Sequence, residues 1–161
     1  MTLNFRNILN AATVASMLFL GAATFTSCGK EGCTDAEANN YDVDATDDDG
    51  SCIFDHTKFV GTYTVNESCS SGNYNYSMTI AEASSNQVTI TLTNLGNFQN
   101  TVLSGTVSGD ALTIASQTVT IDGTAVGFSG QGTISGGTLT IIYVASVGGT
   151  PDNCTATCIK Q

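Results

Sequence analysis

Basic residues and histidine are scarce in this chain of 161 residues. Four Lys and Arg residues stand against 14 Asp and Glu residues, which gives a formal net charge of -10. Such a charge disfavours nucleic acid and anionic membrane surfaces as partners. The single histidine, His56, cannot form a multi-histidine metal site, and its position beside Asp55 predicts a solvated side chain.

Recognisable catalytic motifs are also missing. Gly127-Phe128-Ser129-Gly130 lacks the second glycine of a nucleophile elbow and lies in an alternating pattern typical of a strand, so we expect Ser129 to be structural. No pair of acids after His56 is singled out for acid–base chemistry. We therefore predict that the protein is not an enzyme. These later acids are expected beside turns, where charge keeps a domain soluble: Glu67, Glu82, Asp110, Asp122 and Asp152.

The one long apolar run lies near the amino terminus. Ala11 to Phe25 is too short to cross a bilayer core of roughly 30 Å, and the segment before it carries Arg6 and no acid, as in a signal peptide. The run ends in Phe25-Thr26-Ser27-Cys28-Gly29, which resembles the lipobox of bacterial lipoproteins, with Phe25 where that family usually has an aliphatic residue. The resemblance implies cleavage before Cys28 and lipid on Cys28, which would hold the protein on a membrane without crossing it. Ordinary cleavage nearby, with Cys28 left as a free thiol, is the alternative.

Most of the remaining acids lie between two cysteines. The segment from Cys33 to Cys52 resembles a cysteine-bracketed motif of secreted and surface proteins of the Bacteroidota, with Ala36 in place of the usual Pro. Together with the lipobox, this resemblance implies a lipid-anchored protein of the bacterial cell envelope, on the outer membrane, with the periplasmic face and the cell surface both open. The shared residues are Cys33-Thr34-Asp35, Ala38, Asn40-Tyr41, Ala45 and Asp48-Asp49-Gly50-Ser51-Cys52.

Five aspartates of this segment are candidate calcium ligands. Carboxylates spaced one or two residues apart on an irregular loop can converge on a hard cation such as calcium. The pattern is not an EF-hand, because the twelfth position holds no Glu. The alternative is a solvated, disulfide-closed spacer whose charges keep it extended. The candidate ligands are Asp42, Asp44, Asp47, Asp48 and Asp49.

From Lys58 onward, apolar and polar residues alternate with the period of two that is typical of strands. Turns rich in Gly, Ser and Asn separate the runs at hairpin spacing. We predict an all-β domain, a small eight-stranded antiparallel meander barrel, with a two-sheet β-sandwich as the alternative. The expected runs are Lys58 to Ser68, Tyr74 to Ile80, Val88 to Leu92, Leu103 to Val107, Leu112 to Ile121, Val126 to Ile134, Leu139 to Val144 and Cys154 to Cys158. The chain thus divides into a signal peptide (1–27), a lipidated acidic stalk (28–57) and a β-domain (58–161).

The start of the β-domain carries a further resemblance. Phe59-Val60-Gly61-Thr62-Tyr63 resembles the Gly-x-Trp opening of lipocalin-like barrels, with Tyr63 in place of Trp. It implies a carrier of a small apolar ligand, an alternative to the leading prediction of a non-enzymatic binding or structural module. The side chains best suited to line a ligand site are Tyr63, Tyr74, Tyr76 and Tyr143, although core packing is the commoner role of such residues.

Five cysteines remain once Cys28 is set aside, and export predicts disulfides among them. In a closed meander the first and last strands pair antiparallel, so Cys69 faces Cys154. Cys158 then lies beside Val65, too far along the strand to reach Cys69. We predict two bridges, Cys33–Cys52 and Cys69–Cys154, and a free thiol at Cys158.

Overall fold

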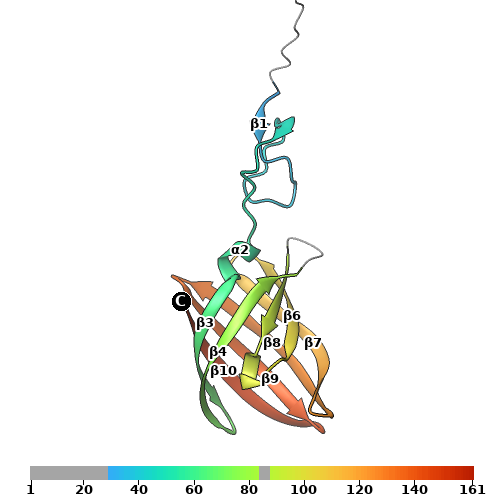
Figure 1. Ribbon diagram of the computed structural model, residues 1–161, viewed down its shortest axis with the longest axis vertical. Helices are drawn as coiled ribbons and strands as arrows, with labels where there is room; N and C mark the ends of the chain where they lie inside the picture. Colours follow the sequence, from blue (N-terminus) through green and yellow to red (C-terminus); the bar gives the residue numbers. More distant parts are fainter. Residues whose placement is uncertain (1–28, 84–87) are drawn as a thin grey trace, which may run out of the picture.

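A closed β-barrel carries the acidic stalk at one end in a computed structural model that describes residues 29–83 and 88–161 (Figure 1). Consecutive strands pair antiparallel, and the last strand pairs with the first. The predicted eight-stranded meander barrel is confirmed, and the sandwich alternative is wrong. The strands are β3 (Gly61–Cys69), β4 (Gly72–Glu82), β5 (Thr89–Thr93), β6 (Val102–Ser108), β7 (Ala111–Ile121), β8 (Thr124–Ser135), β9 (Thr138–Val147) and β10 (Thr150–Lys160).

The seam between β3 and β10 has the register expected from the cysteines. Cys154 lies opposite Cys69 and Cys158 lies opposite Val65. A disulfide joins Cys69 to Cys154 across 4.0 Å between Cα atoms. Cys158 is a buried free thiol. The predicted pairing is therefore confirmed at the residues that close the barrel.

The barrel interior is filled with side chains, as the alternation requires. On β3, for example, Tyr63 and Val65 point inward and are fully buried, while the intervening Thr64 is exposed. Gly130 on β8 lets that strand approach β9 closely, because a Cβ at Gly130 would lie 2.5 Å from the Cβ of Tyr143. The largest fully buried side chains are Tyr63, Tyr143, Phe59, Phe128, Met78, Ile80, Ile90, Leu92, Leu95, Leu103, Leu112 and Ile114.

The end of the barrel next to the stalk is closed by a short helix, α2 (His56–Phe59), where the sequence predicted a strand from Lys58. Phe59 is fully buried, and its carbonyl oxygen accepts a hydrogen bond of 2.7 Å from the Tyr63 hydroxyl. His56 is 3% exposed, and its Nε2 lies 3.0 Å from Oε1 of Glu82. The prediction of a solvated histidine was wrong, because the helix turns this side chain under the barrel rim.

The acidic stalk is held by polar contacts and one disulfide. A pair of two-residue strands, β1 (Glu31–Gly32) and β2 (Asp47–Asp48), runs parallel. The predicted bridge Cys33–Cys52 is present, with 4.8 Å between Cα atoms. Within residues 29–55 the buried side chains are Cys33 and Ala38. No helix within residues 29–83 and 88–161 has both the length and the apolar character needed to cross a membrane.

The opposite end of the barrel, called the distal end below, is formed by the turns β3–β4, β7–β8 and β9–β10 (Figure 1). Its wall is incomplete beside β4. Strand β5 ends at Thr93 and pairs with β4 only at Thr79–Glu82, so residues 72–78 of β4 have no strand on that side. A short 3₁₀ helix, η1 (Leu95–Asn97), lies against β4 there, and Asn94 Nδ2 donates to the carbonyl oxygen of Ser77 over 2.7 Å.

Candidate ligand-binding site

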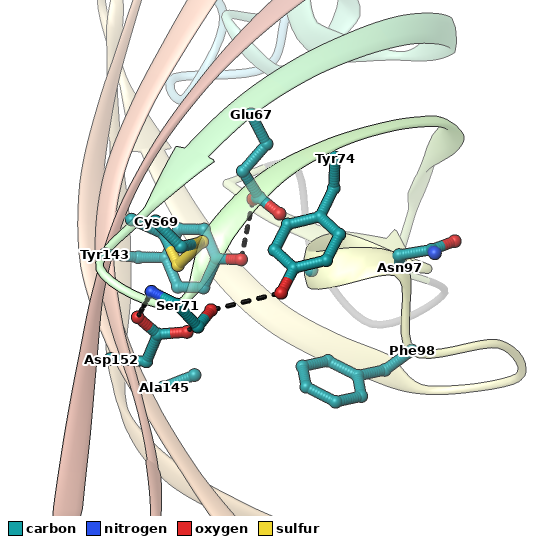
Figure 2. Close-up of a pocket in the computed structure, with 11 residues that line it drawn as sticks. Glu67, Cys69, Ser71, Tyr74, Asn97, Phe98, Tyr143, Ala145 and Asp152 are labelled. Carbon is teal, nitrogen blue, oxygen red and sulfur yellow. Dashed lines mark hydrogen bonds between the residues drawn. A yellow bond between two sulfur atoms is a disulfide. The ribbon is translucent and has the colours of Figure 1, made fainter.

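A cavity of about 250 Å³ lies at the distal end, where β4 lacks a strand partner. Figure 2 shows its walls, which come from β3, β4, η1, β9 and β10. Ser71, Tyr74 and Asn97 are exposed at the rim, and the other lining residues are buried or half-buried. The lining residues are Glu67, Cys69, Ser71, Tyr74, Gly96, Asn97, Phe98, Tyr143, Ala145, Asp152 and Cys154.

Glu67 is the buried acid of this cavity. It follows Tyr63 and Val65 on the inward face of β3 and is only 4% exposed. Its Oε1 accepts hydrogen bonds from the hydroxyls of Tyr143, at 2.7 Å, and Tyr76, at 2.9 Å. Hydrogen bonds to a charged acceptor are among the stronger ones in proteins, so these two tyrosines fix the carboxylate in place.

The two tyrosines remain donors over the whole ordinary pH range. Burial raises the pKa of Tyr143, and its hydrogen bond to Glu67 adds to the rise. Burial likewise raises the pKa of Tyr76, and the negative charge of Glu67 adds to it. The hydroxyl of Tyr76 also accepts the backbone N–H of Gly96 at 2.9 Å, which ties η1 to the same cluster.

The second carboxylate oxygen of Glu67 has no partner. Within residues 29–83 and 88–161, Oε2 is buried and accepts no hydrogen bond. Asn94 Oδ1 shares this property but is not part of the cavity lining. Leaving a buried acceptor unpaired costs roughly 1–3 kcal/mol, and more when the acceptor is charged. Proteins therefore rarely retain such an atom without a use for it.

The rim of the cavity is organised by a second acid. Asp152 accepts the backbone N–H of Ser71 at 3.0 Å and also accepts the Ser71 hydroxyl. That hydroxyl lies 3.2 Å from the hydroxyl of Tyr74, and both contacts are drawn in Figure 2. On the other side, the ring of Phe98 packs edge-on against Phe128, with centroids 5.6 Å apart. The rim thus presents two aromatic side chains and one partly buried carboxylate.

Three side chains with potential metal-ligand atoms also lie at this cavity. Ligand atoms of Glu67, Cys69 and Cys154 lie within 4.8 Å of one another. The two sulfur atoms are joined in a disulfide, however, and a metal requires free thiolates. In the oxidised protein this group supplies one carboxylate and no thiolate, so the cluster does not constitute a metal centre.

The four predicted ligand-lining tyrosines divide into three groups. Tyr74 and Tyr143 line the cavity. Tyr76 stands behind Glu67 and orients it. Tyr63 lies at the stalk end and bonds to Phe59 instead, so it serves core packing. The structure therefore brings three of the four hydroxyls to the distal end of the barrel.

The five predicted calcium ligands do not form a cluster. Asp42 pairs with Lys30, whose Nζ lies 2.7 Å from Oδ2. This contact lowers the pKa of Asp42, and a backbone hydrogen bond from Asp44 adds to the effect. Asp48 and Asp49 accept the backbone N–H groups of Gly50 and Ser51. Three or more of these carboxylates do not come within ligand distance of one another in the described part of the stalk. Calcium binding by Asp42, Asp44, Asp47, Asp48 and Asp49 stays a prediction and requires a rearrangement of this loop.

The predicted lipidation residue, Cys28, and the signal peptide before it lie outside the described residues. The structure therefore places the stalk from Gly29 onward, at the end of the barrel opposite the cavity.

Glu67 is the residue that sequence reasoning missed. It was expected beside a turn, for solubility, and instead lies inside the barrel. The sequence contained a signal for this position. The alternation of the first predicted strand puts Glu67 on the same face as Tyr63 and Val65, the face expected to point inward. Cys69, predicted to form the disulfide at the barrel seam, continues the same face. Because charged side chains are rarely buried, a carboxylate on the inward face of a strand indicates a functional site.

Other depressions of the barrel are wider but contain no buried acid among their described lining residues. One, of about 560 Å³, is lined by Asp122, which is exposed. A groove of about 890 Å³ runs over β7, β8 and β9, with Gln131, Ile142 and Asn153 among its lining residues. Its lining residues include no Asp, Glu, Lys, Arg or His in the part of the chain that is described. The distal cavity is therefore the better candidate site.

Comparisons with known proteins find a similarity only among solved structures. No protein-family model and no curated protein matches the chain. Among solved structures, a "putative outer membrane protein" from Bacteroides fragilis is similar, with a TM-score of 0.48 and 17% sequence identity. The similarity covers 69% of this chain and 54% of that one, so the chain spans about half the length of that protein. A similarity at this level does not extend to function.

Proposed function

We propose that this chain is a non-enzymatic binding protein of the bacterial cell envelope, anchored through lipid on Cys28, whose barrel holds a small ligand in the distal cavity. The observation that carries the binding role is the unpartnered Oε2 of Glu67 beside that cavity. A ligand donor at this oxygen would offset the cost of burying it. We expect no nucleic-acid partner, since the net charge is -10.

The anchor and the cavity lie at opposite ends of the protein. The stalk leaves the barrel at the α2 end, whereas the cavity is formed at the distal end (Figure 1). A lipid at Cys28 would place the membrane on the stalk side of the barrel. The sequence resemblance implies that this membrane is the outer membrane. The cavity would then face away from the membrane, where a dissolved ligand can enter.

The lipocalin-like alternative, a carrier of a small apolar ligand inside the barrel, has less support. The central interior is occupied by side chains such as Met78, Phe128 and Tyr63, which are 2% exposed or less. A ligand enclosed there would have to displace them. The available space lies at the mouth, beside a carboxylate that an apolar ligand would leave unpaired.

The anchor is tested by metabolic labelling with an alkyne fatty acid in a bacterium that processes lipoproteins. The full chain should be labelled and recovered with membranes, and the Cys28→Ser variant should be unlabelled and soluble in the periplasm. An unlabelled wild-type protein in the soluble periplasmic fraction would overturn the anchor.

The binding role is tested by ligand-observed NMR with the full chain and a mixture of small cationic, neutral and anionic compounds. Ala145 lines the cavity, so Ala145→Leu fills part of it and serves as the blocked variant. We expect compounds that bind the wild type and lose binding to the variant. If no compound of any charge binds, or if Ala145→Leu binds all of them unchanged, the cavity is not a ligand site.

A further inference from the structure

We propose that the ligand of the distal cavity is a small organic cation with a primary ammonium or amidinium head and a short aromatic or apolar body. This inference rests on the proposed binding role of the cavity and specifies its chemistry. The head group would donate to Oε2 of Glu67, the oxygen that no described group satisfies.

The charge of the cavity selects a cation. Its lining contains two acids, Glu67 and Asp152, and no Lys, Arg or His among the described residues. A carboxylate that is 4% exposed interacts strongly with a nearby charge, because little water screens it. An anion would be repelled, and a neutral ligand would leave the buried charge uncompensated.

The hydrogen bonds of Glu67 select the position of the head group. Oε1 is already occupied by Tyr143 and Tyr76. Both hydroxyls donate to that oxygen, so a further donor is directed to Oε2. Asp152 has both oxygens engaged with Ser71, and it contributes long-range attraction at the rim.

The walls select the body of the ligand. Tyr74 and Phe98 flank the opening, as Figure 2 shows. Aromatic faces attract organic cations and stack on flat groups. The remaining walls include Ala145 and the Cys69–Cys154 disulfide, which are apolar. A cavity of about 250 Å³ is smaller than typical sites for drug-sized ligands, so the cation is small.

Oε2 is itself buried, so a ligand reaches it only after a lining side chain moves. We assign this movement to Tyr74, an exposed lining residue that is drawn beside Glu67 in Figure 2. It is 38% exposed, and its hydroxyl is held at the rim by a contact of 3.2 Å with Ser71. Rotation of this ring breaks one exposed hydrogen bond and leaves the Glu67 cluster intact.

Titration calorimetry with the full chain tests the ligand class with four probes of similar size. Benzylammonium and benzamidinium carry the charge, benzyl alcohol is neutral, and benzoate is an anion. We expect the two cations to bind, and benzyl alcohol and benzoate to bind at least about tenfold more weakly, as the loss of a charged hydrogen bond predicts.

Two variants assign the effect to Glu67. Glu67→Gln keeps an acceptor for the two tyrosines and removes the charge, so it should weaken both cations by at least about tenfold. Asp122→Asn is the matched control, because Asp122 is an exposed acid in the β7–β8 turn of the same end and is not part of the lining. It removes the same charge and should leave the affinity unchanged. A thermal unfolding midpoint close to that of the wild type verifies that Glu67→Gln is folded, and Tyr74→Leu provides a second variant, with weaker cation binding expected.

The outcomes separate this inference from the proposed function. Binding of benzyl alcohol or benzoate at the cavity, in preference to the cations, would overturn the cation and leave the binding role in place. Equal weakening by Glu67→Gln and Asp122→Asn would show that net charge, not Glu67, attracts the probes, and would also overturn it. Failure of all four probes, together with failure of the mixed-compound screen, would count against the cavity as a binding site of any kind.

Discussion

The barrel and the stalk are stabilised in different ways. The barrel closes an eight-stranded sheet, interrupted beside the first part of β4, around a cluster of 22 buried core residues in the described part of the chain. In the stalk, residues 29–55, the buried side chains are Cys33 and Ala38, and most hydrogen bonds of its aspartates are exposed. Apolar burial is the dominant favourable contribution to folding, and exposed polar contacts add little. The comparison indicates that the barrel folds by itself, whereas the stalk depends on its disulfide.

The largest expected effect is on the barrel seam. Cys69 and Cys154 are separated by 85 residues, and replacing both by Ala should lower the free energy of unfolding by about 4 kcal/mol in the chain-entropy description. Urea unfolding followed by circular dichroism measures this loss. Cys158→Ala, in the same strand, is the control and should cost less. An unchanged midpoint for the double variant would contradict the role of the seam.

The second effect separates the two regions. The Cys33–Cys52 disulfide closes a loop with a sequence separation of 19. In the chain-entropy description it stabilises the folded stalk by roughly 3 kcal/mol. Replacing both by Ala should unfold the stalk locally and leave the barrel midpoint unchanged. Hydrogen exchange should show loss of protection confined to residues 29–55. Loss of protection in the barrel strands as well would mean that the two regions fold together.

The third effect concerns the Glu67 cluster inside the barrel. Glu67→Ala leaves the hydroxyls of Tyr76 and Tyr143 without their acceptor and should cost roughly 2 kcal/mol. Glu67→Gln retains an acceptor and should cost less. Chemical denaturation of both variants gives the difference. Equal costs would indicate that the tyrosines do not depend on this carboxylate.

A fourth, smaller effect is a loss of barrel stability at alkaline pH. Burial, with the charge of Glu67 adding to it, raises the pKa of Cys158 from 9.0 to about 12, and burial raises the pKa of Tyr63 to about 12. Below about pH 8 the stabilisation is fully present, because both groups are protonated in the folded and the unfolded chain. As the pH rises toward 12 the unfolded chain releases these protons first, so the free energy of unfolding falls, by roughly 1 kcal/mol at pH 10 for Cys158.

Cys158→Ala should reduce this slope between pH 9 and pH 11, and the native thiol should resist alkylation at pH 8 while reacting after denaturation. Urea titrations at a series of pH values and a thiol assay check both points. Rapid labelling of the native protein would show that Cys158 is accessible.

The smallest effect is expected in the stalk, from calcium. Lys30 forms an ion pair with Asp42, and its Nζ lies 3.8 Å from Oδ2 of Asp44. Its ammonium group would therefore compete with a calcium ion for these two carboxylates. We predict that calcium binds residues 31 to 55 in the millimolar range and that Lys30→Ala strengthens the binding. Calorimetry that detects no calcium binding to either protein would leave the spacer role for the stalk.

The difference between the regions also explains what the sequence could predict. The alternation of apolar and polar residues, with the turn residues between the runs, predicted the eight-stranded barrel. Antiparallel pairing of the first and last strands then predicted Cys69 opposite Cys154 and Cys158 opposite Val65, as observed. These features depend on the backbone register, which the period of two encodes directly.

Features that depend on tertiary contacts were not predictable in this way. The helix α2 buries Phe59 against the barrel interior, and His56 is buried by the same turn. The cavity exists because β5 stops at Thr93 and η1 covers β4, which no local pattern reported. The inward position of Glu67 was predictable from its alternation with Tyr63 and Val65. The two tyrosines that bond to its Oε1, and the lack of a partner for its Oε2, were not.

The most direct test of the account is the location of bound cation, determined by mapping amide chemical shifts of the isotope-labelled full chain during titration with benzylammonium. The account predicts shifts concentrated at the distal end, in residues 67–76, 94–98, 143–147 and 150–154, and their loss in Glu67→Gln but not in Asp122→Asn. Shifts concentrated in the acidic stalk, or spread over the whole negatively charged surface and equal in both variants, would contradict it.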